Sequence, residues 1–431
     1  MARRLKIAAT SCSIHRWTGR LLFLCLGLLV SGSVRADTTR ADTTAEPPKS
    51  VTIHGHTRTH TSYIEKLVRD CLDGAAYPQQ PGYLDSYLTQ CMINTKLFEK
   101  IKINFTSNTI EVEVQERWTL IPIPYLQVNT GNSRQVGLIV LESNFGGEGK
   151  MLAGGAALSN VGASFFGYYQ DPAIYFSNWR GDILADHVNQ QLRLYKGRKI
   201  VDSFIESTNG VLGGFGYRWS NLVTNAHLGA RQRAFVQDGQ FTPPTNQTFT
   251  YLNALAEYSN KDFHFYGNHG ISFKVNATRQ LTRSDDVERA ANADYLFSFE
   301  RIVIKHALQV QLAGGTLVGG AKEDAYRLGG NKGFRGVERY GVWADHYQVV
   351  AMDYQVPVES FDDGTVTIGL FNDFGVLHQA GANGYATNFD SFGIATYFYL
   401  TAIALPGIGI EFGLNKQFQG PFANLTIGLS I

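Results

Sequence analysis

Alternation of apolar and polar residues runs through much of the second half of the chain. In residues 348–357 the apolar side chains fall on one face, and Asp353 falls on the other. Residues 365–375 repeat the pattern, with Ile368 on the apolar face and Asp373 on the opposite face. A period of two predicts β-strands that have one apolar side and one side that accepts carboxylates.

The same alternation marks residues 270–277, 407–415 and 422–431. The last segment places five apolar residues on one face: Ala423, Leu425, Ile427, Leu429 and Ile431. A strand needs roughly 9–11 residues to span a bilayer, so residues 118–431 have room for about sixteen strands. Fourteen strands is the alternative, because the pattern resolves the third to sixth strands poorly.

Composition agrees with strands that face lipid. Only 17% of the residues are charged, 12% are aromatic, 45 are glycines, and the net charge is +1. Soluble chains usually carry about 25% charged residues. We therefore expect a mainly β protein, a transmembrane antiparallel β-barrel. A large secreted β-sandwich or β-helix is the alternative.

The start of the chain predicts a secretory leader. Residues 1–36 combine a basic start, a short apolar core and a small-residue cleavage site, as in a signal peptide. The apolar core, residues 21–30, is short for a transmembrane helix, so a membrane anchor is the less favoured alternative. Residues 37–49 are polar and proline-ended, which predicts a flexible leader.

Residues 50–117 predict a small α/β domain with the order β-α-α-β-β. We expect the first helix to begin with Ser62 as its N-cap, and Glu65 to complete a capping box. The second helix is expected over residues 83–95, and two alternating strands follow it.

The cysteines predict one crosslink. Cys12 and Cys25 leave with the signal, whereas Cys71 and Cys91 fall on the apolar stripes of the two helices. In an oxidising compartment we expect a disulfide that joins these helices. Two buried thiols are the alternative.

A glycine-rich segment interrupts the strand pattern. Seven glycines, with both signs of charge, lie between Gly319 and Gly341. Glycine suits tight turns and close packing, so the segment predicts a long ordered loop. About eleven of the predicted strands precede Tyr326, and about five follow Tyr340.

Motifs around this loop resemble those of the BamA-type outer-membrane β-barrel superfamily. Phe334-Arg335-Gly336 resembles the Arg-Gly-aromatic signature of the family's loop. Residues 352–357 resemble the preceding strand, and residues 371–375 resemble the Phe-x-Asp-x-Gly strand that receives the loop. Residues 144–149 resemble the Asn-x-x-Gly-x-Gly turn after the second strand. The chain departs from the family at Val337, where an aromatic is usual, and at Asp353, where glutamate is usual.

The superfamily combines POTRA domains with a surface-antigen barrel, and it includes outer-membrane protein insertases and two-partner-secretion transporters. The resemblance implies a barrel in the bacterial outer membrane, with residues 50–117 as one POTRA-like domain in the periplasm. It places residues 318–341 in the barrel lumen. Residues 37–49 show no pattern for the plug helix that is common in two-partner-secretion transporters.

The resemblance and the alternation together assign a partner to Arg335. A guanidinium in a lumen can fork onto carboxylates. Asp353 and Asp373 face inward on adjacent predicted strands, so we expect Arg335 to pair with one or both, Asp373 first. The alternative places Arg335 in a solvated extracellular loop.

The first and last strands predict a weak seam. Strand one is expected near residues 121–130 and the last strand over residues 422–431. Pro122 and Pro124 would remove hydrogen-bond donors from one edge of strand one, and we expect that edge to face Leu425, Ile427, Leu429 and Ile431. The two prolines could instead belong to the connection from the small domain.

The sequence contains no motif for catalysis. A Gly-x-Ser-x-Gly elbow, zinc-ligand spacing and a phosphate loop are all missing. His54, His56 and His60 are interpreted as solvated loop residues. We therefore expect no enzyme activity, cofactor, metal or nucleic acid. The expected partners are outer-membrane lipid, unfolded or nascent polypeptides bound by strand addition, and periplasmic accessory proteins.

The resemblance implies that the protein assists insertion, assembly or translocation of polypeptides at the outer membrane. A dedicated exporter of one secreted partner, or a passive channel, is the alternative.

Overall fold

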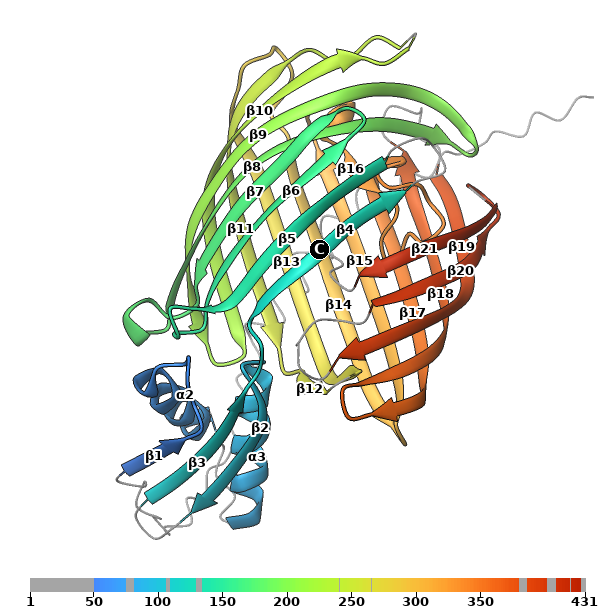
Figure 1. Ribbon diagram of the computed structural model, residues 1–431. Coiled ribbons are helices and arrows are strands. Elements are labelled where there is room, and N and C mark those ends of the chain that lie inside the picture. The colour runs from blue at the N-terminus through green and yellow to red at the C-terminus, as the bar shows by residue number, and fades with distance from the viewer. Residues whose placement is uncertain are drawn as a thin grey trace, which may run out of the picture. The chain divides into compact units, whose positions relative to one another are not determined.

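The computed structural model describes most of residues 50–427 (Figure 1). The described ranges are 50–74, 81–105, 109–128, 134–239, 241–264, 266–379, 386–400, 408–418 and 420–427. The predicted signal peptide and leader, residues 1–49, lie outside the described residues. Leu429 and Ile431 of the predicted last strand also lie outside them.

A small α/β domain precedes the barrel. It contains β1 (Ser50–His54), α2 (Thr61–Gly74), α3 (Pro81–Asn94), β2 (Phe98–Phe105) and β3 (Thr109–Glu116). The sheet order is β1-β3-β2, with β1 parallel and β2 antiparallel to β3. Its core includes Ile64 and Val68 of α2, Leu88 and Met92 of α3, and Ile110 of β3, all completely buried. In the described part of the chain, no helix is both long and apolar enough to cross a membrane.

The start of α2 differs from the sequence prediction. The helix begins at Thr61, and the carbonyl of His60 accepts hydrogen bonds from the backbone N–H groups of Tyr63 and Ile64, at 3.0 and 3.1 Å. The backbone N–H of His60 in turn donates to the carbonyl of Gly147 at 2.9 Å. The N-cap prediction at Ser62 was therefore wrong. A tertiary contact, which a capping motif does not encode, holds the residue before the helix.

A disulfide crosslinks the two helices of the small domain. Cys71 and Cys91 are bonded, with their Cα atoms 6.0 Å apart and 20 residues of sequence separation. Cys71 is buried in the same core as Ile64 and Leu88. The crosslink therefore joins α2 to α3 across the face that they bury.

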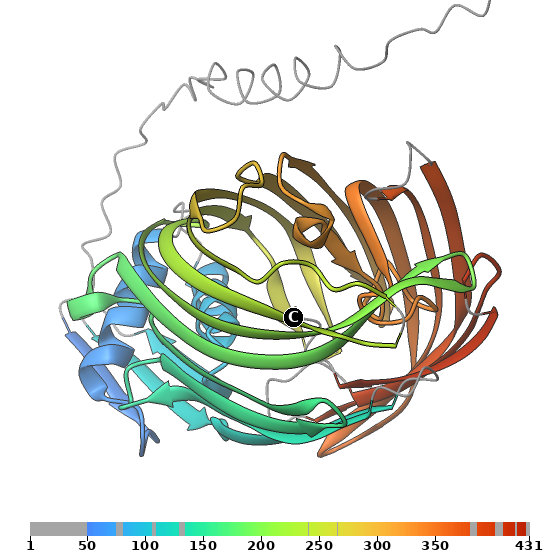
Figure 2. The same ribbon diagram turned by 90° about the horizontal axis from the view of Figure 1, so that it is seen from above.

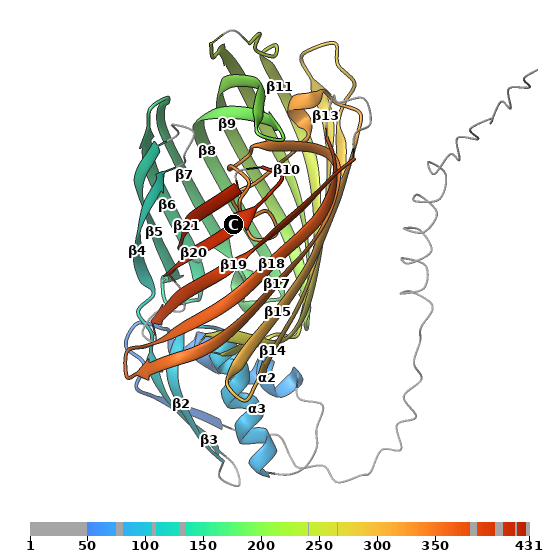
Figure 3. The ribbon, with the colours of Figure 1, turned by 90° about the vertical axis from the view of Figure 1, so that its right-hand side faces the viewer.

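The larger part of the chain is a closed barrel of antiparallel neighbours (Figures 1 and 2). Its strands are β4 (Leu120–Val128), β5 (Arg134–Phe145), β6 (Lys150–Ser159), β7 (Gly162–Asp171), β8 (Trp179–Lys196), β9 (Lys199–Trp219), β10 (Leu222–Gln237), β11 (Gln247–Ser259), β12 (Asp262–His264), β13 (Gly267–Arg283), β14 (Ala291–Val303), β15 (His306–Val318), β16 (Tyr326–Leu328), β17 (Val342–Phe361), β18 (Gly364–Gln379), β19 (Ala386–Leu400), β20 (Ile408–Asn415) and β21 (Gly420–Ile427). Figure 3 shows β17 to β21 side by side in this order.

The described strands fit the predicted count. β12 and β16 are only 3 residues long, and β11 and β15 pair beyond them with β13 and β17. The remaining sixteen described strands are β4 to β11, β13 to β15 and β17 to β21. Eleven of them precede Tyr326 and five follow Tyr340. The predicted fold class, a mainly β antiparallel barrel, is confirmed.

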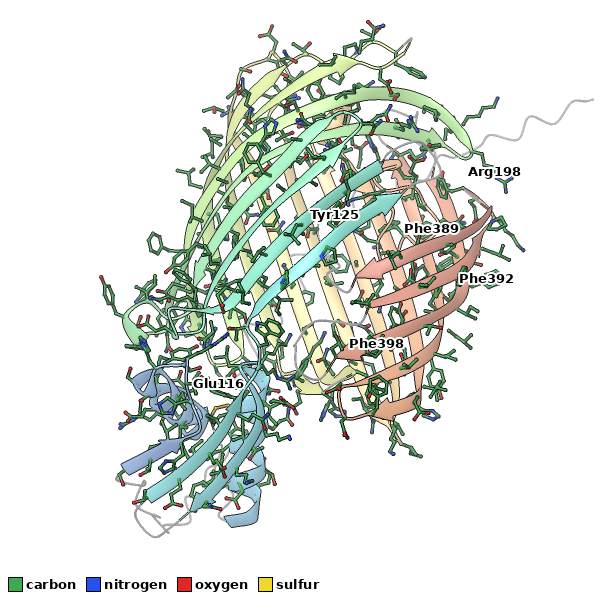
Figure 4. All side chains as sticks on the ribbon, viewed as in Figure 1. Glu116, Tyr125, Arg198, Phe389, Phe392 and Phe398 are labelled. Carbon is green, nitrogen blue, oxygen red and sulfur yellow. A yellow bond between two sulfur atoms is a disulfide. The ribbon has the colours of Figure 1, made fainter. Side chains whose placement is uncertain are left out.

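The barrel turns its apolar side chains outward. On β18, Ile368 and Leu370 are 49% and 61% exposed, whereas Thr367 and Asp373 are completely buried. On β20, Ile410 and Phe412 are exposed, and Glu411 between them is buried. Figure 4 shows side chains on both surfaces of the barrel wall. An apolar outer surface around a polar interior is the arrangement of a barrel whose solvent is lipid.

Glu116 is the last residue of β3, the final strand of the small domain (Figure 4). Its carboxylate accepts hydrogen bonds from the backbone N–H groups of Thr57, Arg58 and Thr59, at 3.0, 3.0 and 2.7 Å, and from the Thr57 hydroxyl at 2.7 Å. Burial acts to raise the pKa of Glu116, but these hydrogen bonds outweigh it and lower the pKa to about 2. The ionised carboxylate therefore orders the loop between β1 and α2.

Acidification should weaken this part of the small domain. The pKa of Glu116 is lower in the folded state than its usual value near 4.5. Its stabilising effect is therefore complete above that value and is lost as the pH falls toward 2. We expect Glu116→Gln to remove part of the loss of thermal stability between pH 5 and pH 2. The control is Glu113→Gln, because Glu113 lies on the same strand in an exposed ion pair with Lys102. Equal pH dependence in both variants would contradict the assignment.

The disulfide should stabilise the small domain. Closing a loop of this length contributes about 3 kcal/mol by the chain-entropy estimate. Reduction, or the double substitution Cys71→Ser and Cys91→Ser, should lower the free energy of unfolding by about this amount. Amide hydrogen exchange of α2 and α3 in the full chain measures the effect. Mass spectrometry that finds both thiols free in protein purified without reductant would refute the prediction.

Candidate functional site

The segment between β15 and β17, residues 319–341, folds back against the barrel wall and is called the lumen loop below. It contains a turn of 3-10 helix, η3 (Lys322–Asp324), and the short strand β16, which pairs with the start of β17. Backbone hydrogen bonds then close it on itself, from Gly330 to Val337 at 2.9 Å and from Gly341 to Glu338 at 2.8 Å. The sequence predicted an ordered loop here but not its strand.

Charged side chains hold the first half of the lumen loop to the wall formed by β9, β10 and β13. Arg327 donates to both carboxylate oxygens of Glu206 on β9, at 2.5 and 2.9 Å. Arg233 on β10 bridges Glu206 and Asp324, at 2.5 and 3.1 Å. Arg283 on β13 donates to the other oxygen of Asp324 at 2.5 Å. Each charge is met by opposite charges, so the network can be buried.

The sequence analysis missed this network. Glu206 and Arg233 lie in strands of 21 and 16 residues, where apolar and polar positions do not alternate strictly. The available signal was the pair Asp324 and Arg327, which carry opposite charges one turn apart at the start of the loop. Nothing in the sequence indicates which strands receive them.

Arg335 holds the second half of the lumen loop to carboxylates on β17 and β18. Its Nε and Nη2 atoms donate to the two oxygens of Asp373, at 2.9 and 2.5 Å. Its Nη1 atom donates to Asp353 at 2.7 Å. Arg335 is 1% exposed, and Asp373 is completely buried. The structure therefore brings together the three residues that the sequence analysis named, with the two-pronged contact on Asp373.

The backbone of the lumen loop also binds Asp373. The N–H groups of Gly333 and Arg335 donate to its Oδ2 atom, at 3.1 and 3.0 Å. A single carboxylate thus fixes both the side chain and the main chain at this point. Asp373 reaches the loop from β18, where it follows Phe371 on the inward face.

Four further side chains complete the cluster. Lys332 lies 2.5 Å from Asp353. Glu411 on β20 lies 3.5 Å from Arg335 and accepts a hydrogen bond from the Tyr397 hydroxyl at 2.7 Å. The Arg335 guanidinium lies 4.0 Å from the centre of the Phe371 ring, a cation–π contact. The cluster thus contains three carboxylates and two cations. Lys332 and the Phe371 contact were missed, although Lys332 stands three residues from Arg335.

The neighbours of Arg335 in the motif have steric roles. Phe334 is buried, and its ring stacks on Phe389 with 5.0 Å between centroids. Gly336 has φ +74°, and a Cβ there would lie 2.5 Å from the Phe422 ring of β21. Only glycine combines this backbone conformation with this close approach. The motif therefore places an aromatic anchor, a charge and a close contact in consecutive residues.

The two prolines lie in the first barrel strand, β4, where the strand order places β21 on its other side. Ser143 donates its backbone N–H to the carbonyl of Thr119, at 3.1 Å, one position before the register of β4 and β5 begins at Leu120. Bonded positions alternate along an antiparallel pair. Pro122 and Pro124 are therefore at positions that direct their backbone toward β21, and neither has an N–H to donate.

The remaining seam residues are placed as follows. Leu425 pairs with Ile410 and is 53% exposed, so it belongs to the apolar outer surface. The backbone of Ile427 pairs with Ile408 at the end of β21.

Within the described residues, no group of three or more His, Cys, Asp or Glu side chains could hold a metal ion. Asp353, Asp373 and Glu411 converge on a guanidinium, so this cluster is suited to fixing a loop.

Several solved structures share the fold of this chain. No protein-family model matches the sequence, and no curated protein matches it. BamA from Haemophilus ducreyi lacking POTRA domains 1–3 is similar with a TM-score of 0.51 and 14% identity, over 88% of this chain and 82% of that one. CdiB from Acinetobacter baumannii and CdiB from Escherichia coli each give a TM-score of 0.53 and 11% identity, over 88% of this chain and 73% and 74% of theirs. The chain shares the barrel fold of these structures, which is the fold that its motifs predicted.

Removing the Arg335 side chain should release the lumen loop. Arg335→Ala leaves Asp353 and Asp373 buried without this cation, at a cost of about 3–5 kcal/mol. We expect faster proteolysis within residues 319–341 and a lower thermal unfolding temperature, while the strands stay folded. Arg335→Lys should recover only part of the loss, because lysine lacks the fork. Arg301→Ala, at an exposed position on β14, is the control. Equal rates of proteolysis within residues 319–341 in Arg335→Ala and Arg301→Ala would contradict this prediction.

Proposed function

We propose that the protein spans the outer membrane and assists the insertion or translocation of polypeptides there, with the small domain in the periplasm. The BamA-type fold and the apolar outer surface support the membrane location. The small domain has the element order of a POTRA domain, which supports its place on the periplasmic side.

The observation that carries this proposal is the edge of β4 beside β21. Inside lipid, every backbone N–H and C=O group must find a partner within the protein. Pro122 and Pro124 offer no donor to β21, so the ladder that closes the barrel is weaker at this position than a ladder without prolines. A weak seam can separate at lower cost than other strand pairs, and its edges can pair with a strand of another polypeptide.

The small domain offers a second place for strand addition. β1 and β2 form the two edges of its sheet, with β3 in the middle. An extended polypeptide that adds to an edge gains main-chain hydrogen bonds without requiring a particular sequence. The domain could therefore hold unfolded or nascent polypeptides before they reach the seam.

A passive channel is less well supported. The lumen loop is held to the wall formed by β9, β10 and β13 by one buried ion network, and to Asp353 and Asp373 on β17 and β18 by a second. We propose that a loop tied at both places narrows the lumen, and that its release from these buried ion pairs regulates the barrel. Export of one dedicated partner remains the second candidate function.

Restoring the missing donors should impair the proposed activity. The double substitution Pro122→Val and Pro124→Val adds two N–H groups toward β21 and should strengthen closure. Pro357→Val on β17 is the matched control away from the seam. In cells depleted of the native protein, we expect the control to restore outer-membrane protein levels and the seam variant to fail. Proteomics of the outer membrane and the medium is the measurement.

The pattern of loss separates the candidate functions. Loss of many outer-membrane proteins supports insertion, and loss of one secreted protein supports dedicated export. Full restoration by the seam variant would contradict the role of the seam. Unchanged protein levels on depletion, together with steady conductance of the purified barrel, would favour the channel.

A further inference from the structure

The lumen loop touches both sides of the barrel closure within five residues. On one side, Gly336 packs against the ring of Phe422 on β21, and Asn415 on β20 donates to the carbonyl of Arg335 at 3.4 Å. On the other side, Nη1 of Arg339 donates to the hydroxyl of Tyr125 on β4 at 2.5 Å. β4 and β21 are the first and last barrel strands, and they are neighbours in the closed order.

We propose that residues 335–339 form a latch that holds the seam closed from inside. This inference rests on the weak seam of the proposed function and assigns its control to Tyr125, Gly336 and Arg339. The latch replaces, with side-chain contacts, some of the cohesion that Pro122 and Pro124 remove from the backbone ladder.

The two ends of the latch have different chemistry. The Arg339 contact is a charge-assisted hydrogen bond, and the guanidinium also lies 4.9 Å from the centre of the Tyr340 ring. The Gly336 contact is steric, because its backbone conformation and the Phe422 ring leave no room for a side chain. The β4 end can therefore release by losing polar contacts such as the Arg339–Tyr125 hydrogen bond, while the β21 end keeps its steric contact.

The latch is coupled to the buried ion cluster. Arg335 and Gly336 are adjacent, and the Arg335 side chain is fixed by Asp373 and Asp353. Arg339 lies within the turn that the hydrogen bond from Gly341 to Glu338 closes. A polypeptide that displaces Arg335 would move Gly336 and Arg339 with it. The ion cluster thus becomes the control point for the latch.

A second bridge crosses the closure at the tip of the β8–β9 hairpin (Figure 4). Arg198 donates to the carbonyl of Lys416, in the turn between β20 and β21, at 3.4 Å. Tyr195 near the same tip donates its backbone N–H to Gly341 at the end of the lumen loop, at 2.8 Å. The Arg198 contact is long and exposed, so we assign the main restraint to the inner latch.

Spin labels next to the seam test the latch directly. Val136 on β5 and Leu414 on β20 are exposed, and their strands flank β4 and β21. Both are replaced by cysteine in the chain without residues 1–36, in which Cys71 and Cys91 are engaged in the disulfide. Pulsed electron paramagnetic resonance of the barrel in lipid nanodiscs then gives the distance distribution across the seam.

The expected result is a new, longer distance in latch variants. Tyr125→Phe removes a hydrogen bond to a charged group. Because such a bond stabilises the closed seam, its loss should raise the ratio of open to closed seam about tenfold. Arg339→Ala should act in the same direction, and Gly336→Ala should act more strongly through the Phe422 contact. Tyr399→Phe is the control, because its hydroxyl donates to Gln355 on β17, away from the seam.

The conservative Tyr125→Phe variant keeps the ring, and heat-modifiable migration on gels verifies that each barrel is folded. Identical distance distributions in the wild type, Tyr125→Phe and Arg339→Ala would overturn the latch. So would an equal shift in Tyr399→Phe. The distance between the labels is measured on the protein alone, without any polypeptide substrate. A latch that opens as expected in a protein whose depletion changes no other protein would therefore refute the proposed function and leave the latch standing.

Discussion

The burial of one guanidinium sets the conditions for the rest of the lumen. Arg335 is removed from solvent almost completely, and a buried charge is tolerated only when opposite charges and hydrogen bonds surround it. Asp373 can be completely buried for the same reason, because Arg335 and two backbone N–H groups neutralise it. β17 and β18 must therefore present their carboxylates inward. Their apolar neighbours then have only the outer surface left to occupy.

The same constraint explains why the lumen loop has a defined course. Its first half ends on Glu206 and Arg233, and its second half ends on Asp353 and Asp373. Neither cluster is favourable unless its partners arrive together, because a half-satisfied buried network is costly. The glycines between the clusters let the backbone turn, and Gly336 lets it approach β21 closely. Charge determines where the loop is held, and glycine determines how close it comes.

Much of this organisation could be predicted from local patterns. The period of two along residues 348–375 placed Asp353 and Asp373 inside, and the cysteine stripes paired Cys71 with Cys91. These predictions depend only on strand and helix geometry. The pairing of Glu206 with Arg327 was out of reach, because the two residues lie 121 positions apart in the sequence. The start of α2 was missed for a similar reason, since a barrel turn holds His60.

Closure of the barrel has a consequence for the order in which the chain folds. β1 to β3 meet their partners within 59 residues of sequence, and the helices between them are crosslinked over 20 residues. β4, by contrast, has β21, the last described strand of the chain, as its second neighbour. It can complete its pairing only after β21 has formed. Contacts between residues distant in sequence form slowly, because the loop between them must first be closed. The small domain can therefore mature while most of the barrel is still unfolded. During that interval the apolar strand segments of this chain would be exposed and prone to aggregate.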